Sequence, residues 1–244
     1  MAGPSWLGGP AAGITLDEWP RRTDGTPLAH VATFHLQAAD QLDLPEQADW
    51  PILKDGLPTE GVLQIFHDLT LTYGYDPEDA LSGGWLVQWL PDPSLDYLTD
   101  GPDNLDLPSS VCQVIDPLAT FSIPASSDVM GATDRAFAAA EQANEEFQRA
   151  WSFQRTQDPQ AIPLPVTHLY GHSQAGDQLP LHEILPRCLP LEIPGDEYRL
   201  IADIESWTTL EGWFGDASPL EVWMRKNDLE ARAFDRAWCI VRTD

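Results

Sequence analysis

The sequence predicts a β-rich α+β fold in which two sequence-related halves carry mixed or antiparallel sheets and one long helix lies between them. Short apolar runs rich in β-branched and aromatic residues recur between Pro, Gly and Asp clusters. One central segment has helical spacing, and the segments on either side of it share three blocks in the same order. We therefore expect one domain over 1–244, with halves at 5–115 and 165–244 joined by a helix-containing segment at 116–164.

Six runs have the length and composition of strands. In one of them Trp85, Val87 and Trp89 recur with period 2, which places all three on one face of a sheet. The predicted strands are 30–36, 61–67, 84–90, 198–206, 220–224 and 237–242.

The central helix is expected from Thr133 to about Gln157, where the chain has no Pro or Gly. An apolar stripe recurs there at steps of three and four residues, as on one face of a helix. We expect this stripe to pack in the core and the opposite, charged face to meet water. The stripe consists of Phe137, Ala140, Asn144, Phe147 and Trp151.

The internal repeat consists of three matched blocks. Residues 5–13 resemble 168–176, residues 32–35 resemble 202–205, and residues 63–66 resemble 220–223, with offsets of 163, 170 and 157. Drifting offsets are expected where loops lengthen or shorten between retained elements. Chance similarity is the competing explanation, because few residues are identical.

The charge of the chain limits the classes of partner. Against 39 Asp and Glu there are 13 Lys and Arg, a formal net charge of −26, while 43% hydrophobic residues indicate a packed protein. Such a field repels phosphate backbones and anionic membranes, so we expect no nucleic acid and no membrane partner. A basic protein partner is compatible with the charge, and a surface tuned for solubility is the structural alternative.

The cysteines indicate a reducing compartment. Cys112, Cys188 and Cys239 are odd in number and far apart, so they form neither a disulfide framework nor a zinc-binding pattern. No signal peptide or membrane span is recognisable, and we expect a cytoplasmic protein.

Several of these segments together resemble the YwqG-like family, catalogued as domain of unknown function 1963. The resemblance rests on a Gly-Gly turn at 7–10, a Trp-Pro pair at 19–20, and a Leu-Pro-x-x-Gly-x-Leu-Gln-x-Phe element at 57–66. It continues through 200–206, 214–216, 220–224, Leu229 and 234–235. The family implies an α+β fold with duplicated halves and implies no established activity.

The chain departs from the family at a polar pair on each repeated strand. The family's Gln and Asp become Thr33 and His35 in the first half and Asp203 and Glu205 in the second. An acid/base site in a cleft between the halves would use His35, Glu205 and Asp216. The structural alternative places Asp216 in an Asx turn after Gly215.

Metal and cofactor sites are not predicted. His168 and His172 have the spacing of two metal ligands, but Gly171 between them argues against the helix that would bring their rings together. The chain contains no nucleophile elbow, phosphate loop, zinc-protease motif or dinucleotide fingerprint. We expect no metal and no cofactor, and the missing motifs favour a protein that is not an enzyme.

Four of the ten tryptophans lie near predicted turns and are candidates for contact with a ligand: Trp6, Trp19, Trp207 and Trp213. Core packing is the alternative for each.

Two functional hypotheses follow. The first is a non-enzymatic binding protein for a basic protein partner, of which a basic toxin, neutralised as immunity proteins do, is one example. The second is an enzyme or small-ligand-binding protein with its site between the halves.

Overall fold

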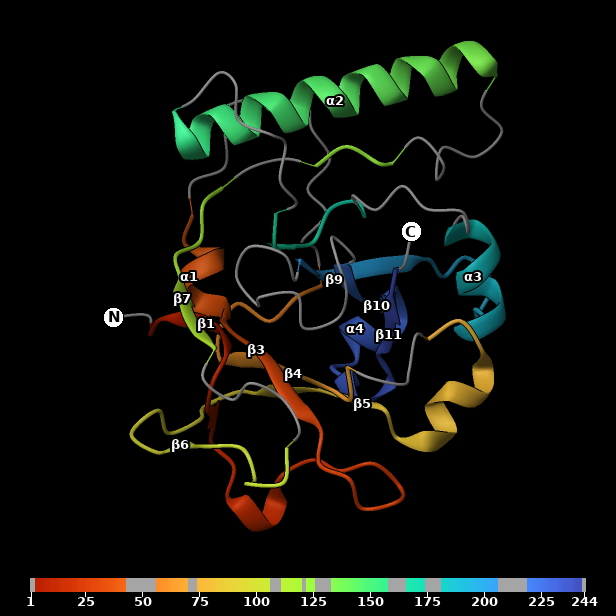
Figure 1. Cartoon of the computed structure of the whole chain (residues 1–244). Coiled ribbons are helices and arrows are strands. Elements are labelled where there is room, and N and C mark those ends of the chain that lie inside the picture. The colour runs from red at the N-terminus through yellow and green to blue at the C-terminus, as the bar shows by residue number, and fades with distance from the viewer. Residues whose placement is uncertain are drawn as a thin grey trace.

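The computed structural model describes residues 3–42, 56–69, 74–105, 111–119, 122–125, 133–157, 166–173, 181–205 and 219–242; of residues 151–156 it describes only the backbone. Two antiparallel sheets stack face to face, with helix α2 (Asp134–Thr156) crossing one end of the molecule (Figure 1). This arrangement confirms the predicted α+β class.

The first sheet has five strands in the order β5-β4-β3-β1-β7. They are β1 (Ser5–Gly8), β3 (Ala29–His35), β4 (Val62–His67), β5 (Trp85–Leu90) and β7 (Cys112–Ile115). A separate two-stranded ribbon pairs β2 (Ala11–Ala12) with β6 (Leu98–Thr99). The Gly-Gly turn after β1 has Gly8 and Gly9 both at a φ of 66°, a conformation that glycine adopts readily.

The second sheet has four strands in the order β11-β10-β9-β8. They are β8 (His168–Leu169), β9 (Tyr198–Glu205), β10 (Pro219–Arg225) and β11 (Trp238–Val241). All six predicted strands are present, as β3, β4, β5, β9, β10 and β11. The strands β1, β2, β6, β7 and β8 were not predicted, because segments of two to four residues are too short to show a period-2 signal.

The remaining elements are short helices. They are η1 (Leu16–Glu18), α1 (Leu36–Asp40), η2 (Pro77–Ser82), α3 (Leu181–Cys188), α4 (Lys226–Glu230) and η4 (Phe234–Arg236). Helix α3 lies against the second sheet (Figure 1), where its buried Leu181, Ile184 and Leu185 join Trp223 and Ile240 in one apolar cluster. Its internal Pro186 explains why the sequence did not indicate a helix there.

The main core lies between the two sheets. Leu7, Ala32, Ile65 and Val87 from the first sheet are buried in one cluster that the second sheet completes with Ala202, Ile204, Val222 and Cys239. Because side chains alternate along a strand, the opposite faces of both sheets point away from this core. A small cluster around Trp19, Leu28 and Phe66 covers that outer face in the first sheet.

The two sheets use the same register in their central strands. Leu7, Ala32 and Ile65 are cross-strand neighbours in the first sheet, and Leu169, Ala202 and Val222 are the corresponding neighbours in the second. The blocks at 32–35 and 63–66 thus match 202–205 and 220–223 at the predicted offsets. The first block is shifted by one residue from the predicted match, since Trp6, and not Ser5, occupies the position that corresponds to His168. The origin of the halves by duplication stays a prediction.

Helix α2 occupies the predicted segment but not the predicted environment. Phe137 is 43% exposed, and Ala140, Asn144 and Phe147 are only half-buried, while the side chain of Trp151 lies outside the described residues. The expectation that this stripe packs in the core is therefore wrong for its described members. The stripe includes Asn144, whose side chain donates to Pro124 O at 2.7 Å, and a backbone contact of this kind anchors the helix with little apolar burial.

Candidate functional site

The predicted acid/base residues end equivalent strands. His35 ends β3 and Glu205 ends β9. Burial lowers the pKa of His35, and among the described residues neither ring nitrogen of His35 has a hydrogen-bond partner. Glu205 is buried, and its backbone N–H donates to Thr167 Oγ1 at 3.3 Å. Asp216 lies outside the described residues, so the three-residue site stays a prediction.

The two described candidate tryptophans are buried. Trp6 is 5% exposed and its indole N–H donates to Pro10 O at 2.8 Å. Trp19 is 3% exposed and donates to Leu28 O at 2.8 Å, while its ring meets Phe66 edge-on. Both indole N–H groups thus serve the fold. Trp207 and Trp213 lie outside the described residues.

The ring of His168 lies against backbone oxygens of the turn that carries His172. The Nε2 atom of His168 lies 3.1 Å from the backbone oxygen of His172, and its Nδ1 lies 3.1 Å from Val166 O. Gly171, with a φ of 90°, places the two histidines in a turn, as expected. Within the described ranges, no three His, Cys, Asp or Glu side chains are grouped so that they could hold a metal ion.

Two carboxyl side chains meet on the outer face of the second sheet. Asp203 on β9 lies directly opposite Glu221 on β10, and the two are 2% and 0% exposed. The hydroxyl of Ser173 donates a short hydrogen bond to Glu221 Oε1, and the indole of Trp223 donates to Oε2 at 2.8 Å. Arg242, itself buried, lies 3.6 Å from the same oxygen. We call Asp203 and Glu221 the carboxyl pair.

Burial favours a proton on the carboxyl pair. Burial raises the pKa of Glu221 to about 8, the Asp203 charge adds to the rise, and Arg242 opposes it. Burial therefore shifts Glu221 towards its protonated form at neutral pH. A buried carboxyl group with a raised pKa opposite a second carboxyl group is the kind of arrangement that supports acid/base chemistry. The pair is nevertheless shielded from surface partners by its burial.

The first sheet has an uncharged version of this arrangement at the same register positions. Gln88 Nε2 donates to Gln64 Oε1 at 2.8 Å, and Gln64 Nε2 donates to Thr33 Oγ1 at 3.2 Å. Thr33 Oγ1 lies 2.8 Å from Nε2 of His30, whose Nδ1 faces the backbone oxygens of the Gly-Gly turn. Burial lowers the pKa of His30 to about 4, so the ring is neutral. Because Nδ1 faces carbonyl oxygens, the ring proton is placed on Nδ1, and Nε2 accepts from Thr33.

Sequence reasoning did not select Asp203 and Glu221 as a site. The available signal was a polar side chain inside an otherwise apolar strand, repeated at Thr33, Gln64, Asp203 and Glu221 in the matched blocks. Strand pairing was needed to place the members of each pair opposite one another.

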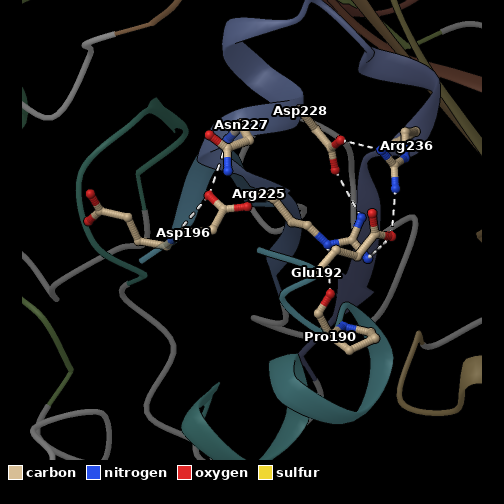
Figure 2. A network of polar contacts seen from close by, with 8 residues as sticks. Pro190, Glu192, Asp196, Arg225, Asn227, Asp228 and Arg236 are labelled. Carbon is tan, nitrogen blue, oxygen red and sulfur yellow. Dashed lines mark hydrogen bonds and ion pairs between the residues drawn. The ribbon is translucent and has the colours of Figure 1, made fainter. Parts of the chain in front are cut away.

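A ring of ion pairs ties the carboxyl-terminal elements together (Figure 2). Arg225 donates to Asp228 at 2.9 Å and lies 3.3 Å from Glu192. Arg236 contacts the same two carboxylates, with 2.7 Å to Glu192. The hydrogen bond from Arg236 lowers the pKa of Glu192, helped by both guanidinium charges. These contacts join β10, α4, η4 and the segment after α3.

Most basic side chains of the second half are bonded within the chain. Residues 165–244 contain 14 acidic and 7 basic residues, a difference of 7, and each of those basic residues has an ion pair or hydrogen bond. Residues 5–115 contain 18 acidic and 3 basic residues, a difference of 15. The negative charge is thus concentrated in the first half.

Exposed carboxylates accompany exposed apolar groups near the β2–β6 ribbon. Tyr97 and Leu98 are 77% and 50% exposed, and Leu16 of η1 is 51% exposed. Asp17, Asp96 and Asp100 are also exposed, as are Glu18, Asp92 and Asp103. This part of the surface, unlike the carboxyl pair, is open to a macromolecule.

The helices that the structure describes include none with the length and apolar character required to cross a membrane. A family model described as Domain of unknown function (DUF1963) matches residues 5–242 and confirms the resemblance inferred from the sequence. No curated protein matches the chain.

Proposed function

The chain belongs to the family described as Domain of unknown function (DUF1963), and we propose that it is a non-catalytic binding protein that engages a basic protein partner. The observation that carries the proposal is the uneven charge, with a difference of 15 between acidic and basic residues in the first half and 7 in the second. A basic toxin neutralised by binding is one partner of this chemistry.

Electrostatics supports a protein that associates quickly. An unneutralised surface of one sign raises the local concentration of an oppositely charged partner and accelerates encounter, and added salt screens the effect. In the first half, Arg22 is bonded to Asp68 and Asp24, and Arg21 donates to Gly25 O. Within the described ranges 3–42, 56–69 and 74–105, Arg21 and Arg22 are the only basic residues, so the carboxylates there far outnumber the cations that could neutralise them.

The cytoplasm is the proposed location of this function. Cys112, Cys188 and Cys239 are all free thiols, which is typical of a reducing compartment.

The test is capture of a partner. The purified chain is immobilised, exposed at low salt to lysate of its own source, and eluted with a salt gradient. One stoichiometric basic protein eluting at moderate salt supports the proposal. Elution of trace contaminants alone contradicts it.

A second candidate function, acid/base chemistry on a small ligand, is favoured by the carboxyl pair, because strongly shifted carboxyl pKa values cluster at active sites. A metabolite screen by thermal shift tests it. A ligand that stabilises the wild type but not Glu221→Gln supports the second function, and equal stabilisation of both proteins contradicts it.

A further inference from the structure

We propose that the β2–β6 ribbon and the neighbouring η1 turn form the docking surface for the basic partner, and that this partner inserts apolar side chains lying between its Lys and Arg residues. The inference rests on the proposed function and names its surface. We call Leu16, Asp17, Asp96, Tyr97, Leu98 and Asp100 the ribbon surface.

The ribbon surface is formed by two segments that the fold holds together. Ala12 on β2 is the cross-strand partner of Leu98 on β6, and Thr99 Oγ1 donates to Ile14 O at 2.6 Å. A Cβ atom placed on Gly101 would lie 3.4 Å from the ring of Trp19. Both ends of the 15–18 segment are thus tied to residues 99–101. The η1 turn, which carries Leu16 and Asp17, is therefore held next to the segment that carries Tyr97, Leu98 and Asp100.

The support beneath the ribbon surface is rigid. Trp19, at the end of η1, is buried in the cluster with Ala11, Leu28 and Phe66. Thr15 and Glu18 form a capping box, in which the Thr15 N–H and hydroxyl donate to Glu18 at 3.0 and 2.8 Å. These hydrogen bonds lower the pKa of Glu18, so its charge is retained. Because this backbone is already packed and hydrogen-bonded, binding need not pay to order it.

The composition of the ribbon surface matches a protein interface of one charge. Interfaces place aromatic and aliphatic anchors at the centre and polar groups at the rim, and tyrosine is a frequent anchor. Tyr97, Leu98 and Leu16 provide the apolar groups, and every charged side chain of the surface is a carboxylate. The sequence has no Lys or Arg in 11–20 or 91–105. Charge complementarity thus selects a basic occupant.

The position of the ribbon surface separates it from other features of the molecule. η1 and β6 lie at the end of the molecule opposite α2 (Figure 1). Leu191 and Ile193, 41% and 54% exposed on the second half, form an apolar pair of similar exposure beside the ion-pair ring and provide a matched control.

The experiment uses two labelled peptides, one with six arginines each followed by leucine and one with six arginines each followed by glycine. Binding to the full chain is measured by fluorescence anisotropy at low salt. In the double variant Tyr97→Ser, Leu98→Ser, the leucine peptide is expected to bind about tenfold more weakly, and the glycine peptide is expected to bind unchanged. The control Leu191→Ser, Ile193→Ser is expected to bind both peptides as the wild type does. Thermal melting verifies that each variant is folded.

Two results overturn the inference, and they differ in what else they affect. If the wild type binds the peptides but Tyr97→Ser, Leu98→Ser leaves the leucine peptide unaffected, or the control weakens it equally, the ribbon surface is wrong and the proposed function stands. If the wild type binds neither peptide at low salt, the proposed function fails together with the surface.

Discussion

Asp203 and Glu221 face each other across the second sheet at the register positions that Thr33 and Gln64 occupy in the first. A hydroxyl and an amide in one half are replaced by two carboxyl groups in the other, with Arg242 close by. The same arrangement of strands therefore carries neutral polar side chains in the first sheet and titratable side chains in the second. This difference makes stability depend on pH in a way that variants can separate.

The free energy of unfolding is expected to reach its maximum near pH 6.5. Burial lowers the pKa of His30 and of His67 to about 4, so the unfolded chain takes up these protons first and stability falls as the pH drops from about 6.5 towards 4. Burial raises the pKa of Glu221 to about 8, so stability also falls as the pH rises from about 4.5 to 8. Each titrating group contributes a slope of about 1.4 kcal/mol per pH unit. Denaturant unfolding between pH 4.5 and 9 measures the fall in the free energy of unfolding on both sides of the maximum.

The variant His67→Asn tests whether His67 causes part of the loss of stability below about pH 6.5. The Nδ1 atom of His67 accepts from the Leu69 N–H at 2.9 Å, and an Asn side-chain oxygen can replace that acceptor. Removing one of two titrating histidines should halve their combined contribution to the acid slope. An unchanged slope would show that His67 is not one of the groups responsible.

Glu221→Gln should stabilise the protein at pH 8.5 and have little effect at pH 5. A Gln side chain is uncharged, as the protonated Glu is, so it avoids the cost of losing a buried proton. Its oxygen can still accept from one of the two groups that donate to Glu221, Ser173 or Trp223. Unfolding curves at the two pH values provide the comparison. Destabilisation at pH 8.5 would mean that the Arg242 ion pair outweighs desolvation and that burial does not raise the pKa of Glu221.

Gly74→Ala should destabilise the protein by more than about 3 kcal/mol. Its φ is 81°, and a Cβ atom there would lie 1.9 Å from Cys239 O, so backbone strain and a backbone clash act together. Gly25→Ala is the matched control, because its φ is 90° with no atom within 4 Å of the added Cβ, and should cost about 1 kcal/mol. Equal losses in thermal melting would argue against close packing of residue 74 on β11.

Asp228→Asn should cost about 3 kcal/mol, since Asp228 is 6% exposed and contacts both Arg225 and Arg236. Glu197→Gln removes an exposed carboxylate that pairs with Arg199 and Lys226 and should cost at most about 1 kcal/mol. Chemical denaturation of both variants measures the difference. Similar values for the two would place the ion-pair ring among ordinary surface contacts.

The sequence predicted the fold better than the site. Period-2 runs such as 84–90 mark strands because a half-buried strand requires them, whereas β8 has only two residues and shows no pattern. The spacing of α2 was read correctly, but spacing does not reveal how closely a helix approaches the sheets. Asp203 and Glu221 could not be predicted as a site, because they are 18 residues apart in the chain and become neighbours only through strand pairing.

The position of the ribbon surface was also beyond the sequence. Acidic residues occur throughout the chain, and only the pairing of β2 with β6 and the hydrogen bond from Thr99 to Ile14 bring the η1 turn next to residues 97–100. The net charge can be counted in the sequence, and it predicts the class of partner but not where the partner would bind.

The central claim is that the uncompensated charge of the first half drives binding of a basic protein. The most direct measurement compares two variants that each lose four exposed carboxylates: Asp17→Asn, Asp92→Asn, Asp96→Asn, Asp100→Asn in the first half, and Glu141→Gln, Glu145→Gln, Glu146→Gln, Glu183→Gln outside it. The association rate constant with the captured basic protein is measured by biolayer interferometry at low and high salt. The first variant should associate at least tenfold more slowly at low salt, and the second should lose much less. Equal losses, or none in either variant, would contradict the claim.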